Sequence, residues 1–116
     1  HFLDYVPYED LPKLINQAIA LVLPSWWEGF GLPALEAIAC GTPVIASRLG
    51  ALPEVIGDAG ILIDPYDLTA LEQAIAQLIN QPDLSQDLQR RGLTQAQKFS
   101  WSNTGQITNS LLRHLL

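Results

Sequence analysis

The chain has 116 residues, of which 48% are hydrophobic, and this size allows one globular domain at most. No apolar run approaches the roughly 20 residues that a membrane-spanning helix needs, and a single cysteine excludes an internal disulfide. The net charge of −6 makes the chain a poor match for an anionic partner unless basic groups come from elsewhere, so we expect no nucleic-acid partner. No Cys/His cluster has the spacing of a zinc site, and we expect no metal.

The first quarter of the chain predicts a strand, a helix and a second strand. The opening residues around Phe2 are typical of a strand. Residues 10–18 place Leu11, Leu14, Ile15 and Ala18 on one helical face. The apolar run that follows, residues 19–23, is long enough for a strand buried on both faces.

A glycine loop and a short helix come next. Gly29 and Gly31 allow the backbone to turn sharply, and Pro33 suits the first helical position because its fixed φ fits a helix. Gly41 suits the position just past the end of that helix. The apolar residues 44–46 then predict another strand.

This order predicts a ligand site, because ligands of parallel sheets lie beyond the carboxyl ends of the strands. The free amides of Gly31 and Leu32, with the positive end of the helix dipole, favour a phosphate. Glu28 in the loop and Glu36 one turn into the helix are expected to face the same cleft, and carboxylates accept hydrogen bonds from sugar hydroxyls. A nucleotide sugar satisfies both demands.

The second half of the chain predicts one more strand, over residues 60–64, followed by helices. The spacing of Thr69 and Glu72 fits a capping box at the first of these helices. Leucines on the later helices are most simply packing residues. The helices are expected over residues 68–79, 84–98 and 101–116.

Two unusual residue types stand near the glycine loop. Trp26 and Trp27 would suit stacking on a sugar or a base, but the favoured interpretation places one in the core and leaves the other partly exposed. Cys40, near the end of the short helix, is most simply a small buried residue.

Residues 28–37 and 40–47 resemble the E-x7-E signature of glycosyltransferase family 4. Residues 6–14, 52–55 and 60–65 match the flanking pattern, so the likeness covers nearly the whole chain. The family consists of retaining enzymes of GT-B architecture, which have two Rossmann-like domains and bind the donor mainly through the second. The resemblance implies an α/β fold: a parallel-sheet, Rossmann-like half-domain from the C-terminal domain. About four strands are expected, beginning near Phe2, Ala20, Val44 and Ile61.

The resemblance also implies an activity, the transfer of a sugar from a UDP-, GDP- or ADP-linked donor to a hydroxyl acceptor with retention of configuration. Glu36 would accept hydrogen bonds from the ribose, and Glu28 would face the donor sugar as the catalytic residue. Backbone groups near Val6 and Pro7 would approach the base. No cofactor or metal is implied. The donor-binding residues implied by the resemblance are Val6, Pro7, Glu28, Gly29, Phe30, Gly31, Leu32 and Glu36.

Residues 1–116 are therefore expected to form one partial domain. The family's basic phosphate-binding pair would lie in a segment before Phe2. We therefore expect the first strands of this domain and the N-terminal acceptor domain to be absent from this chain. We expect the chain alone to be inactive and, with an uncovered apolar edge, marginally stable or self-associating. The parent protein would act in polysaccharide or glycolipid biosynthesis, in the cytoplasm or at the cytoplasmic face of a membrane. Peripheral membrane contact through the missing part is left open.

Three rival functions are compatible with parts of this sequence pattern. A nucleotide-sugar-binding module without transfer activity is the main alternative, because the acceptor side lies outside the chain. A glycoside hydrolase also uses two carboxylates, but a glutamate fixed at a helix start beside a phosphate-type loop disfavours it. A purely structural domain would not need carboxylates on both sides of a glycine loop.

Overall fold

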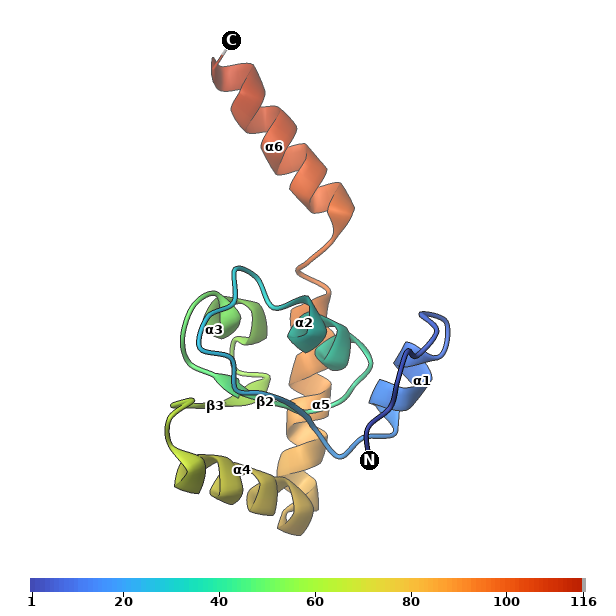
Figure 1. Cartoon of the computed structure of the whole chain (residues 1–116). Coiled ribbons are helices and arrows are strands. Elements are labelled where there is room, and N and C mark those ends of the chain that lie inside the picture. Colours follow the sequence, from blue (N-terminus) through green and yellow to red (C-terminus); the bar gives the residue numbers. More distant parts are fainter. Residues whose placement is uncertain (116) are drawn as a thin grey trace.

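A computed structural model of the chain describes residues 1–115 and shows a parallel sheet between helices (Figure 1). The strands are β1 (Leu21–Leu23), β2 (Val44–Ser47) and β3 (Gly60–Ile63), and they lie in the order β1-β2-β3. Both pairings are parallel, with Val22 opposite Ile45 and Ile45 opposite Ile61. The predicted α/β class with a parallel sheet is confirmed.

The predicted fourth strand, near Phe2, is wrong for the residues that the structure describes. Residues 1–7 have no regular secondary structure, and the side chain of Phe2 is fully exposed. A strand needs a neighbour to complete its hydrogen bonds. Within residues 1–115, the sheet consists of β1, β2 and β3, and the opening segment pairs with none of them.

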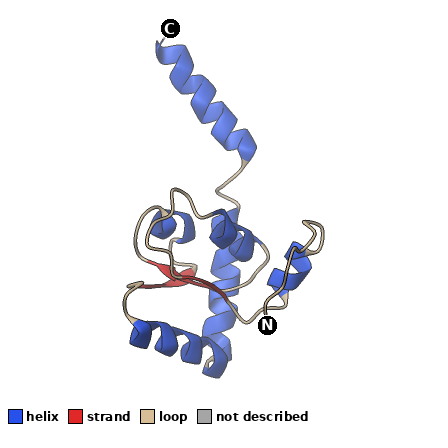
Figure 2. Cartoon of the chain, in the orientation of Figure 1, coloured by secondary structure: helices blue, strands red, loops and turns tan. Residues whose placement is uncertain are grey.

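The central strand β2 is buried on both faces, as its continuous apolar sequence requires. Val44 and Ala46 pack into one cluster with α2 (Leu32–Ala39) and α3 (Leu52–Ile56). On the other face, Ile45 packs with residues of α4 and α5. Figure 2 shows the strands enclosed between these two helical layers.

The remaining helices frame this core. α1 (Leu11–Asn16) packs beside α2, and α4 (Leu68–Asn80) covers the face of the sheet opposite α2 (Figure 1). α5 (Pro82–Ala96) contacts α2, α3 and α4. α6 (Trp101–Leu115) projects away from the body, and none of its described residues is buried.

Two helix starts differ from the sequence prediction. The N-cap of α4 is Asp67, whose side chain accepts a hydrogen bond from the Ala70 N–H at 2.9 Å, so the Thr69/Glu72 capping box is wrong. Both Asp and Thr suit an N-cap, and the spacing alone selected the wrong one. Pro33 is the second residue of α2, after Leu32, rather than the first.

A buried glutamine connects α5 to α3. The Gln95 side chain donates hydrogen bonds to the carbonyls of Glu54 and Val55, at 3.3 and 3.1 Å. Its own carbonyl accepts from Lys98 Nζ at 2.7 Å. These bonds satisfy carbonyls at the end of α3, which have no partner within a helix of five residues.

We expect Gln95→Ala to loosen α3, because it removes the donor to a buried carbonyl. The free energy of opening α3 should fall by about 1–3 kcal/mol. Hydrogen–deuterium exchange of the α3 amides in the full-length protein that contains this chain measures this change. Gln89→Ala, at an exposed position on the same helix, is the control. Equal exchange in the two variants would contradict the prediction.

Candidate functional site

The loop between β1 and α2 ends at Gly31, a position that favours glycine for two reasons. Gly31 has φ +93° and caps α2, and its carbonyl accepts from the amides of Ala34 and Leu35 at 3.0 and 3.2 Å. A Cβ at this position would lie 2.5 Å from Cδ2 of Leu52. Both the left-handed backbone and the contact with α3 therefore require the smallest residue.

The same loop presents amides without internal partners. Among residues 1–115, the N–H groups of Gly29, Phe30, Gly31 and Leu32 donate to no group of the chain. They precede or begin a helix whose N-terminus carries partial positive charge. Gly29, Phe30 and Leu32 are exposed, so these amides lie in a segment that solvent reaches. Such a group of amides can bind an anion.

Glu28 is half-buried and held in place by its own loop and by the loop after β2. Its Oε1 accepts a hydrogen bond from Ser25 Oγ at 2.8 Å, and its backbone carbonyl accepts from the Ala51 N–H at 3.1 Å. Gly50, with φ +65°, lies against this carbonyl so closely that a Cβ would come within 2.7 Å of it. Sequence reasoning missed Ser25 and Gly50 as supports of Glu28, because the contact with Gly50 spans more than twenty residues.

Glu36 is also half-buried and lines a hollow of about 450 Å³ between α1 and α2. The other lining residues are almost all apolar. They are Leu11, Leu14, Ile15, Ala18, Ala20, Leu21, Pro33 and Thr42.

Two hydrogen bonds hold α1 in position at one side of this hollow. Thr42 Oγ1 donates to the Ile15 carbonyl at 2.8 Å, and Asn16 Nδ2 donates to the Cys40 carbonyl at 2.7 Å. A helix of six residues has little stability of its own, so these contacts and the packing of Ile15 fix its position.

Val6 and Pro7 lead directly into this wall. The Pro7 carbonyl accepts from the amides of Asp10 and Leu11, at 2.9 and 3.2 Å, and so begins the turn into α1. Val6 is half-buried and Pro7 is exposed. The structure thus places the predicted base-side residues next to the helix that faces Glu36.

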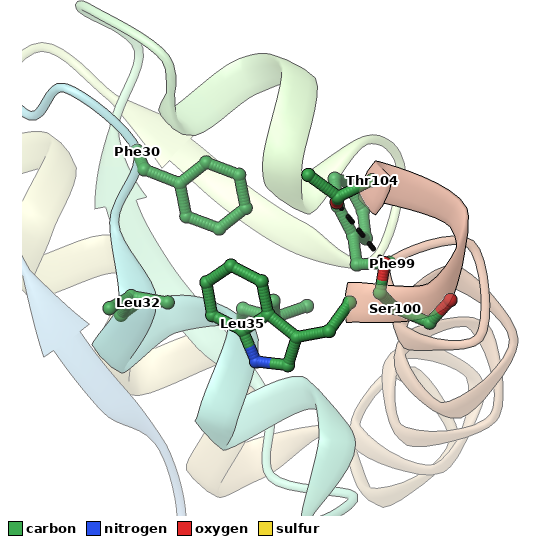
Figure 3. Close-up of a pocket in the computed structure, with 7 residues that line it drawn as sticks. Phe30, Leu32, Leu35, Phe99, Ser100 and Thr104 are labelled. Atoms are coloured by element: carbon green, nitrogen blue, oxygen red, sulfur yellow. Dashed lines mark hydrogen bonds between the residues drawn. The ribbon is translucent and has the colours of Figure 1, made fainter. Parts of the chain in front are cut away.

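A second hollow, also of about 450 Å³, lies between α2 and the junction of α5 with α6 (Figure 3). Phe30, Leu32 and Leu35 line one side of it, and the junction between α5 and α6 lines the other. Phe30 meets Phe99 edge to face, with ring centroids 5.8 Å apart. The remaining lining residues are Ser100, Trp101 and Thr104.

The two hollows divide the predicted site. The neighbouring residues Leu35 and Glu36 line different hollows, and Glu28 lines neither. The structure brings Phe30 and Leu32 together at one hollow and Glu36 and α1 together at the other. A cleft shared by Glu28 and Glu36 stays a prediction.

The basic residues of the first half are already engaged. Lys13 forms an ion pair with Asp10 at 2.8 Å, and Arg48 forms one with Asp64 at 2.7 Å. The pKa of Asp64 lies below its usual value because its carboxylate accepts hydrogen bonds from the Tyr66 N–H and from the Arg48 guanidinium. Asp64 therefore stays ionised at neutral pH, and the ion pair joins the loops after β2 and β3.

Both tryptophans are exposed, which contradicts the expectation that one is in the core. Trp26 and Trp27 have 67% and 77% of their surface exposed. Trp26 stacks on Tyr66, with ring centroids 5.7 Å apart and an angle of 21° between the planes. The sequence could not reveal this pair, because the two residues follow different strands.

Cys40, at the C-terminal end of α2, is half-buried. Burial raises the pKa of its thiol, and the charge of Glu36 one turn earlier raises it further. The thiol therefore stays protonated at neutral pH. Within residues 1–115, no group of three or more His, Cys, Asp or Glu side chains could hold a metal ion. In the same part of the chain, no helix is long and apolar enough to cross a membrane.

Comparison with known proteins places the chain in a family. Residues 1–95 match the family model described as "Glycosyl transferases group 1". O-antigen chain mannosyltransferase B of Escherichia coli is 48% identical over 110 residues, which cover 94% of this chain and 29% of that protein. A D-inositol 3-phosphate glycosyltransferase of Saccharomonospora viridis is 40% identical over 106 residues, or 90% of this chain and 24% of that protein.

A solved structure shows the same fold. Sucrose-phosphate synthase from Thermosynechococcus elongatus superposes with a TM-score of 0.89 at 36% sequence identity. The match covers 99% of this chain and 30% of that one. The chain thus has the Rossmann-like half-domain fold of a GT-B glycosyltransferase, and it spans less than a third of the length of these relatives.

We expect Gly50→Ala to destabilise the loop that supports Glu28. A left-handed backbone costs alanine about 1–2 kcal/mol, and the new methyl group must push the Glu28 carbonyl away. Gly105→Ala is the matched control, because a Cβ there meets no atom within 4 Å and lies in the helix α6. Urea unfolding of the full-length variants should show a lower free energy of unfolding for Gly50→Ala only. A Gly50→Ala protein as stable as the control would contradict the close approach.

Proposed function

Because the chain belongs to the glycosyl transferases group 1 family, we propose that it is the donor-binding part of a retaining, family 4 glycosyltransferase. The proposed reaction transfers a sugar from a nucleotide-diphosphate donor to a hydroxyl of an acceptor, with retention of configuration. Residues 1–116 supply part of the donor domain. The first strands of this domain and the acceptor domain lie in the rest of the polypeptide.

The observation that carries this proposal is the hollow beside Glu36. Its volume of about 450 Å³ lies in the range of small-molecule sites. One half-buried carboxylate in an otherwise apolar lining suits a flat base and a ribose. The base would pack against Leu11 and Leu14 of α1, while Glu36 accepts hydrogen bonds from the two ribose hydroxyls.

The unpaired amides before α2 suit the diphosphate and the donor sugar. Gly29, Phe30, Gly31 and Leu32 offer N–H groups at a helix N-terminus, and all of these residues except Gly31 are exposed. Donors fixed in advance stabilise the charge that develops on the leaving phosphate without reorganising. In the proposed same-face reaction, this phosphate helps to deprotonate the acceptor hydroxyl, so no protein nucleophile is needed.

Glu28 is proposed to face the donor sugar. Its support by Ser25 and by the backbone of Ala51 would hold the carboxylate in one orientation. Such an orientation contributes to catalysis because it is established before the substrate arrives.

Cations for the diphosphate are expected from outside the first half of this chain. Lys13 and Arg48 are the two basic residues in the first half of the chain, and both are in ion pairs with carboxylates. The net charge of −6 would otherwise repel the donor. A cytoplasmic role in polysaccharide biosynthesis, in solution or at the membrane face, is part of the same proposal. The similarity to an O-antigen chain mannosyltransferase of E. coli supports the biosynthetic part of it.

We expect Glu36→Gln in the full-length protein to weaken donor binding while leaving turnover nearly intact. A hydrogen bond to a charged group contributes about 1.5–3 kcal/mol, so the donor Kd should rise roughly 10- to 150-fold. Calorimetric titration with UDP, GDP and ADP measures the effect and identifies the base. Glu72→Gln, at an exposed position on α4, is the control. Unchanged affinity for every nucleotide would overturn the role of Glu36.

Glu28→Gln should instead lower kcat by a similar factor, roughly 10- to 150-fold, with a smaller change in nucleotide affinity. The readout is the initial rate of transfer from a labelled donor, with the anomeric configuration of the product determined by NMR. Normal turnover in this variant would contradict the assignment. Tight donor binding without any transfer by the wild-type protein would identify a binding module instead.

A further inference from the structure

The stack of Trp26 on Tyr66 lies at the carboxyl edge of the sheet, on the same side as the glycine loop. Trp26 follows β1 and Tyr66 follows β3, and parallel strands end at the same edge. Trp26 is two residues from Glu28, so their Cα atoms are at most about 7 Å apart. The stack is therefore close to the proposed position of the donor sugar.

The position of this pair is fixed from both sides. The Tyr66 N–H donates to Asp64 Oδ1 at 3.0 Å, and the other carboxylate oxygen accepts from Arg48 at 2.7 Å. On the other side, Ser25 next to Trp26 donates to Glu28. Despite this order, Trp26 and Tyr66 are 67% and 70% exposed. The sheet and helices of the described chain do not cover them.

The chemistry around the pair favours a neutral, hydroxyl-bearing ligand. Aromatic faces attract apolar C–H surface, and a pyranose combines such a face with a rim of hydroxyls. Arg48 and Asp64 stand beside the stack, partly exposed, and supply hydrogen-bond donors and acceptors without net charge. A nucleotide would also stack on an aromatic ring, but its phosphates need a cation, and Arg48 is already paired.

We propose that the Trp26–Tyr66 stack is a subsite for a pyranose unit of the acceptor glycan, on the donor side and in addition to the contacts that the acceptor domain makes. The link between this subsite and sugar transfer rests on the function proposed above, whereas saccharide binding by the stack does not. The subsite holds the acceptor chain one or more units away from the reacting hydroxyl, so a longer acceptor gains contacts that a monosaccharide lacks.

The test uses the full-length protein and four probes: mannotetraose, maltotetraose, cellotetraose and chitotetraose. Calorimetry first identifies the tetraose that binds best, and the matching monosaccharide serves as the short comparison. Trp26→Ala and Tyr66→Ala should each weaken tetraose binding about tenfold, the factor that 1.4 kcal/mol represents, and should leave nucleotide affinity unchanged. Trp26→Phe should restore most of the affinity. Ile79→Ala, at an exposed position at the opposite end of α4, is the control.

The possible negative results lead to different conclusions. If no tetraose binds the wild-type protein, or if Trp26→Ala binds it normally, the subsite is overturned. An equal loss of nucleotide affinity would assign the stack to the donor site or to folding, and also overturns it. Oxidative footprinting should modify Trp26 in the free protein and spare it with the tetraose. A Trp26 that is spared without saccharide is covered by the rest of the polypeptide, and this result also overturns the subsite. Tetraose binding without sugar transfer would refute the proposed function alone.

Discussion

The candidate site depends on one physical constraint, the linkage of three loops at the carboxyl edge of the sheet. The loop after β1 joins the loop after β2 through the Ala51 N–H and the Glu28 carbonyl. The loop after β2 joins the loop after β3 through Arg48 and Asp64. Stacking of Trp26 on Tyr66 joins the loop after β1 to the loop after β3. Each contact alone is modest, but together they fix the backbone of Glu28, since a shift of one loop must move the other two.

Local signals predicted most of the fold. The apolar sequence of β2 identified a strand, and Pro33 with Gly41 marked the two ends of α2 within one residue. The run at residues 19–23 does contain β1, but the prediction that it is buried on both faces is wrong, because Val22 is exposed. These features depend on neighbours in sequence, where backbone sterics decide the outcome. The strand expected near Phe2 failed because pairing needs a second strand, which no local pattern guarantees. The choice between Asp67 and Thr69 as N-cap likewise depends on the residue at which the preceding loop ends and helical backbone angles begin.

The site was predicted less completely than the fold. Sequence located both glutamates and the free amides, because glycine, proline and acid spacing are visible along the chain. It missed Gly50 and the exposure of Trp26, since both depend on loops that follow different strands. A tryptophan is buried more often than not, and only the tertiary arrangement shows that this one is held in place and still exposed.

Charge distribution explains why neutral amides carry so much of the proposed site. All 12 acidic residues lie within residues 1–87, where Lys13 and Arg48 are the only basic ones. An acidic surface repels a diphosphate over a distance of about one Debye length, roughly 8–10 Å. Backbone N–H groups at a helix start provide short-range attraction without adding a side-chain charge. Under the proposed function, the donor affinity of the whole protein should therefore depend on cations from outside these residues, while the amides and the two glutamates would determine how the bound donor is oriented.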